Sequence, residues 1–132
     1  MLVGTESGSF EIWNVDASVE NPTLKQVVAA HENCEQGISS IVELKNPSHL
    51  IIGDKANEGD RFLVSSACDR PELLIWRLGE KDGEIKLTVH IRIATTFDNG
   101  IKYVLQTSPT QLVCVNHERT LKFYDFVDKA VQ

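Results

Sequence analysis

The sequence contains serine, histidine and aspartate residues, which many hydrolases combine in one active site. Ser65 and Ser66 precede Asp69, and His31 lies further upstream. A serine nucleophile needs a histidine base and a carboxylate that orients this base, in a specific mutual geometry. No nucleophile beside a base, no glycine-rich phosphate loop and no paired carboxylates can be read from the chain. We therefore expect a protein that is not an enzyme, with a hydrolase as a remote alternative.

Two short patterns contain residue types that bind metal ions. His31 and Cys34 have the spacing of half a zinc site, but no second close pair accompanies them. Segment 54–60 has a glycine at its sixth position, as calcium loops do. However, Ala56 replaces the third ligand and Ser65 stands in the place of the bidentate glutamate. We expect no metal and no cofactor.

The composition is typical of one soluble globular unit or of part of one. The chain has 132 residues, of which 42% are apolar and 24% charged, and its net charge is −6. No apolar stretch approaches the ~18 to 20 residues of a membrane helix, and no Lys/Arg cluster favours nucleic acid. The three cysteines are widely separated and make a poor disulfide framework. We expect an intracellular protein, cytoplasmic with the nucleus not excluded, that binds neither nucleic acid nor a membrane.

Short runs of β-branched and aromatic residues between turn residues predict an all-β fold. Ser7-Gly8, Asp82-Gly83 and Asn99-Gly100 are expected turns in which glycine supplies positive φ, and the four prolines fall between the runs. The ten expected strands are Leu2 to Thr5, Phe10 to Val15, Leu24 to Ala29, Ile38 to Leu44, Phe62 to Ala67, Leu73 to Leu78, Ile85 to Ala94, Lys102 to Thr107, Gln111 to Val115 and Leu121 to Val127.

Three segments that begin at Leu2, Leu63 and Leu112 repeat one pattern, in which a strand and a small polar turn precede a strand that ends in an aromatic residue. The final residue pairs are Trp13-Asn14, Trp76-Arg77 and Tyr124-Asp125. The pattern resembles the WD40 family of β-propellers, which places a Trp-Asp pair at this position. The aromatic residues are further apart than the ~40 to 45 residues of a WD40 blade, so the resemblance implies long loops.

The resemblance also implies a structural network within the middle repeat. In the WD40 family a His, a Ser or Thr, an Asp and a Trp tie neighbouring strands together. The residues at these positions here are His31, Ser65 or Ser66, Asp69 and Trp76. This assignment is an alternative to the hydrolytic interpretation of the same side chains.

The resemblance implies an incomplete ring of about two and a half blades. Residues 1–37 are expected to form a partial blade, 38–100 a full blade with a long loop, and 101–132 a last blade without its outer strand. The apolar run 49–53 inside the long loop is a possible further strand. Propellers need about four to eight blades, so we expect a fragment, a truncated gene product, or a chain whose ring another polypeptide completes.

A WD40-like segment implies a scaffold that binds proteins or peptides through its loops. Loop residues that the resemblance places on one narrow face are the candidate contacts: Glu32, Arg70, Phe97, Asp98, His117 and Arg119. Phe97 and Arg70 are the expected anchors, and acidic loops would select basic partners. The alternative function is that of a structural subunit, half of a split propeller that adds to the sheets of another chain.

Overall fold

The computed structural model describes residues 1–15, 21–31, 35–45, 61–81 and 84–125. These residues form ten β-strands and no helix, so the all-β prediction is confirmed. Accordingly, they contain no helix with the length and apolar character needed to cross a membrane. The possible strand at 49–53 lies outside the described residues.

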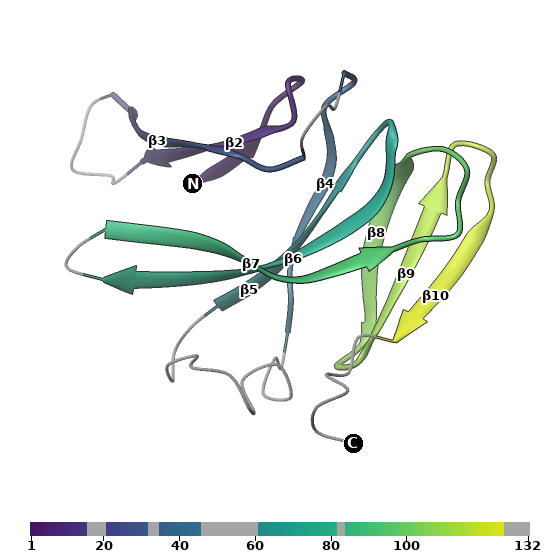
Figure 1. Cartoon of the computed structure of the whole chain (residues 1–132). Coiled ribbons are helices and arrows are strands. Elements are labelled where there is room, and N and C mark those ends of the chain that lie inside the picture. The colour runs from purple at the N-terminus through teal and green to yellow at the C-terminus, as the bar shows by residue number, and fades with distance from the viewer. Residues whose placement is uncertain (16–20, 32–34, 46–60, 82–83, 126–132) are drawn as a thin grey trace.

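The strands form three antiparallel sheets, and within each sheet the strands are ordered as in the sequence (Figure 1). The first sheet contains β1 (Leu2–Gly4), β2 (Ser9–Asn14) and β3 (Thr23–Ala29). The middle sheet contains β4 (Ile38–Glu43), β5 (Arg61–Ala67), β6 (Arg70–Lys81) and β7 (Glu84–Ala94). The third sheet contains β8 (Ile101–Ser108), β9 (Gln111–Asn116) and β10 (Leu121–Asp125).

The middle sheet is covered on both faces, because it lies between the other two. Successive side chains of a strand point to opposite faces. Leu73 and Ile75 of β6 belong to a cluster shared with the third sheet, whereas Leu74 and Trp76 belong to a cluster shared with the first sheet. All four side chains are at most 3% exposed. The continuous apolar run in β6 therefore reflects a strand that is buried on both sides.

Two glycines set the spacing between consecutive sheets. Gly37 precedes β4 and has a φ of 92°, and a Cβ there would lie 2.5 Å from Glu6 Cα in the first sheet's hairpin. Gly100 precedes β8, and a Cβ there would lie 1.9 Å from the Cys68 carbonyl oxygen in the middle sheet's hairpin. The middle and third sheets thus each begin with a glycine packed on the hairpin of the preceding sheet.

Two details of the turns differ from the sequence-based expectations. Gly100 does not have a positive φ, so it is required by the close approach to Cys68 rather than by a turn. Pro71 lies inside β6 rather than before it. The proline is tolerated because the pairing of β5 with β6 shifts register between Ser66 and Ala67 at this end of the strand.

In each of the three hairpins, the aromatic residue of the second strand lies opposite a residue in or directly before the first strand. In one hairpin this residue differs from the expected one. Leu63 lies opposite Trp76, and Leu112 lies opposite Tyr124. Trp13 instead exchanges two backbone hydrogen bonds of 2.8 Å with Met1, whereas Leu2 lies opposite Ile12. Met1, and not Leu2, is therefore the counterpart of Leu63.

Candidate functional site

A chain of buried hydrogen bonds connects the first two sheets. The indole nitrogen of Trp76 donates to Ser65 Oγ over 2.9 Å, and Ser65 Oγ lies 2.8 Å from His31 Nε2. Ser65 is 0% exposed and His31 4% exposed. A hydroxyl that is enclosed and shared between two such bonds is not placed to attack a substrate. The arrangement joins strands β5 and β6 to the segment after β3.

The other two residues of the expected network make different contacts. Asp69 Oδ2 accepts a 2.7 Å hydrogen bond from the Glu35 backbone nitrogen, so this carboxylate fixes the chain just before β4. Ser66 lies on the opposite face of β5 from Ser65, and its hydroxyl is 2.7 Å from that of Ser39. The structure therefore brings His31, Ser65 and Trp76 together. Asp69 and Ser66 instead bond to Glu35 and Ser39, outside this chain of hydrogen bonds.

Burial controls the protonation of two groups, His31 between the first and middle sheets and Cys114 between the middle and third sheets. The pKa of His31 is lowered from 6.5 to about 4, mainly by burial and also by the Arg92 charge, whereas the Asp69 charge acts in the opposite direction. The imidazole is therefore neutral at pH 7. Burial raises the pKa of the Cys114 thiol to about 12, so this thiol stays protonated. No group of three or more His, Cys, Asp or Glu in the described part of the chain could hold a metal ion, and Cys34 lies outside that part.

Turns from all three sheets gather at one end of the molecule, along the top of the view in Figure 1. We call this end the turn face. It comprises residues 5–8, 35–37, 68–70, 95–100 and 116–120. A backbone hydrogen bond of 3.0 Å from Ile38 to the Thr5 carbonyl and a 3.4 Å bond from Asn99 Nδ2 to Glu118 Oε1 link these segments.

Asn116 builds the turn that presents two of the predicted contact residues. Its Oδ1 accepts hydrogen bonds from the backbone nitrogens of Glu118 (3.0 Å) and Thr120 (2.9 Å). Short polar side chains stabilise turns in this way. Arg119 adopts a φ of 66° within this turn, and both His117 and Arg119 are exposed.

The remaining candidate contacts have different environments. Asp98 is exposed and Arg70 is half-buried, whereas Glu32 lies outside the described residues. Phe97 is only 5% exposed, which corrects the expectation that it is a surface anchor. The loop before β8 folds this ring into the cluster between the middle and third sheets, and the Lys122 ammonium lies 4.7 Å from the ring centroid.

The charges of the turn face are mainly acidic. Among its described residues, the carboxylates are those of Glu6, Glu35, Asp69, Asp98 and Glu118. The arginines in the same segments are Arg70 and Arg119. Carboxylates therefore outnumber arginines on the described part of this face, which gives it a negative potential.

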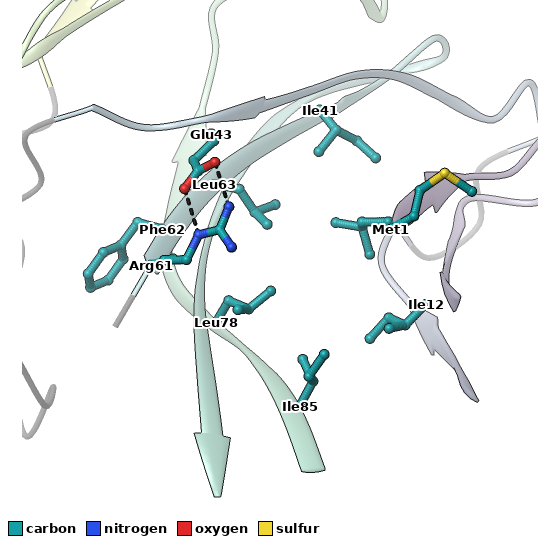
Figure 2. A pocket seen from close by; sticks show the side chains of 10 residues that line it. Met1, Ile12, Ile41, Glu43, Arg61, Phe62, Leu63, Leu78 and Ile85 are labelled. Atoms are coloured by element: carbon teal, nitrogen blue, oxygen red, sulfur yellow. Dashed lines mark hydrogen bonds and ion pairs between the residues drawn. The ribbon is translucent and has the colours of Figure 1, made fainter. Parts of the chain in front are cut away.

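An apolar cleft of about 410 Å³ lies at the end opposite the turn face, between the first and middle sheets. Figure 2 shows Met1 and Ile12 on one side, facing Ile41, Leu78 and Ile85 on the other. Arg61 and Glu43 form an ion pair of 2.7 Å on one wall. Sequence reasoning missed this cleft because its residues come from strand ends that meet only after the two sheets pack.

Comparisons with models of protein families, with curated proteins and with solved structures gave no match to this chain.

Proposed function

We propose that the chain is a segment of a WD40-type β-propeller and acts as a non-catalytic platform on which partner proteins dock. Consecutive meandering sheets that pack face to face in sequence order support this proposal. The hydrogen bonds from Trp76 to Ser65 and between Ser65 and His31 also support it, because they join residues at the positions expected from the family.

The acidic turn face carries the docking proposal. It combines segments of all three sheets on one rigid support, and it presents the exposed side chains of Asp98, His117, Glu118 and Arg119. Binding residues are often found on loops that a rigid scaffold positions. We infer that the partner contributes a Lys- or Arg-rich segment, and that the charge of the face raises the association rate.

Titration calorimetry with synthetic peptides of about ten residues that contain several Lys or Arg tests this function. We expect at least one such peptide to bind, with an affinity that falls as salt is added because exposed charges are screened. Replacement Asp98→Lys should weaken binding by about 3- to 10-fold, since one attractive interaction becomes repulsive.

The matched control is Glu80→Lys, which makes the same charge change at an exposed position of β6 outside the turn face. It should leave the peptide affinity almost unchanged. The proposal is overturned if neutral peptides bind as tightly as basic ones, or if Glu80→Lys weakens binding as much as Asp98→Lys does.

A further inference from the structure

The outer face of the third sheet is apolar, and none of the residues that the structure describes forms a sheet packed on it. Two rows of side chains cross this face: Tyr103, Val115 and Leu121 in one row, and Leu105, Val113 and Phe123 in the other. Tyr103, Leu105, Leu121 and Phe123 are between 55% and 61% exposed. We call these six residues the tail face. Contiguous exposed apolar surface usually marks an interaction site.

The middle sheet shows what covers such a face. Its corresponding rows are Ser40, Ser66 and Leu73, and Val42, Val64 and Ile75. Ser66, Leu73, Val64 and Ile75 are all 0% exposed, because the third sheet packs on this side of the middle sheet. The same rows of the first sheet, which include Phe10 and Ile12, are buried by the middle sheet in the same way. In both cases the cover is the opposite face of a following sheet.

In the middle and third sheets, one face packs on the preceding sheet. Among the described residues, the corresponding face of the first sheet has no sheet packed on it. It is the outer face of the first sheet, formed by Val3, Trp13, Leu24 and Val27 around Glu11, and we call it the head face. Trp13 occupies the position in the first sheet that Trp76 occupies in the middle sheet, where Trp76 packs against the preceding sheet. Leu24 and Val27 are 46% and 57% exposed.

Charge also favours contact between these two faces. Glu11 is the acidic residue of the head face, and its carboxylate accepts a 3.2 Å hydrogen bond from the Trp13 indole. Lys102 borders the tail face, with its ammonium 5.5 Å from the Tyr103 ring centroid. A head face that approaches a tail face thus brings opposite charges to the same apolar contact.

We propose that the tail face binds the head face of a second copy of this chain. The contact continues the packing that already joins the first sheet to the middle sheet and the middle sheet to the third. Head-to-tail contacts close into a ring when the rotation permits. The described residues of two copies provide three sheets each, and six sheets lie within the range of about four to eight blades found in closed propellers. This inference rests on the propeller architecture in the proposed function, but it concerns faces other than the turn face, so dimer formation and peptide binding are tested separately.

Sedimentation velocity of the 132-residue chain at tens of micromolar tests the proposal. We expect a species with twice the 14.7 kDa mass of one chain. Replacement Phe123→Lys in the tail face and Val27→Lys in the head face should each raise the dimer dissociation constant by about 100-fold or more, because either change buries an unpaired charge in both contacts. The control Val89→Lys, at an exposed valine of β7, should leave the mass unchanged.

Mixing the two variants distinguishes a head-to-tail contact from other dimers. Phe123→Lys keeps its head face and Val27→Lys keeps its tail face, so an equimolar mixture should recover a dimer through the one intact contact. A monomeric wild-type chain overturns the proposal, as does a Val27→Lys variant that still dimerises or a mixture that stays monomeric. Circular dichroism verifies that each variant retains its β-structure, and Leu121→Lys and Leu24→Lys provide second variants of the two faces.

Discussion

At the scale of single residues, the charge state of His31 links the buried network to pH. Its imidazole is 4% exposed and is bonded to Ser65. Burial keeps its pKa near 4 in the folded chain, below the ordinary value of 6.5. The unfolded chain therefore binds more protons than the folded chain between these two pH values, and folding stability must rise with pH there.

We predict that the contribution of neutral His31 to the free energy of unfolding is fully present above about pH 6.5. This contribution is lost as the pH falls toward 4. Between pH 7.5 and pH 5 the free energy of unfolding should decrease by about 2 kcal/mol from this group alone. Urea unfolding at both pH values measures the change. The variant His31→Gln should be less stable at pH 7.5 and should show a smaller difference between the two pH values. An equal difference in the variant would contradict the assignment, and His117→Gln, at an exposed histidine, is the control.

At the scale of elements, Gly100 determines how the third sheet attaches to the middle one. A Cβ at this position would lie 1.9 Å from the Cys68 carbonyl oxygen and 2.4 Å from the Asp69 backbone nitrogen. Backbone atoms of a hairpin cannot move away as the end of a flexible side chain does. The start of β8 would therefore have to separate from the middle sheet, next to the cluster that includes Ile101.

We predict that Gly100→Ala lowers the free energy of unfolding by about 1 to 3 kcal/mol, the typical range for overpacked substitutions. The neighbouring change Asn99→Ala, which removes only an exposed side chain with a long hydrogen bond, should cost less than about 1 kcal/mol. Chemical denaturation of both variants provides the comparison. If the two variants are equally stable, Gly100 does not set the contact between these sheets.

At the scale of the whole molecule, the two hydrophobic clusters share the middle sheet. Leu73 and Leu74 are consecutive in β6 and fully buried, but they pack against different neighbouring sheets. Loss of the middle sheet's structure would expose both clusters together. We therefore expect the described sheets to unfold as one cooperative unit.

We predict that Leu73→Ala and Leu74→Ala each destabilise the chain by about 2 to 5 kcal/mol, as is usual for a buried leucine. Tryptophan fluorescence and circular dichroism at strand wavelengths should give coincident unfolding curves in both variants. Separate transitions by the two probes would show that the first and third sheets unfold independently of each other.

The sequence by itself determined the ten strands and their grouping into hairpins. Alternating and continuous apolar runs, Gly8 with its φ of 82° and the aromatic residue at the end of each second hairpin strand are local signals. They follow from backbone sterics and from side-chain spacing along a strand, which need no knowledge of distant residues.

Only the tertiary structure decided which faces are covered and which groups meet. Phe97 has no periodic context in the sequence, but the packing of the third sheet buries it. In the sequence, Gly37 and Gly100 resemble ordinary turn residues. The structure shows that each packs closely against a hairpin of the preceding sheet. The apolar cleft and the tail face also depend on the contact between sheets. Burial and close approach are properties of residues that are far apart in the chain, and no local pattern specifies them.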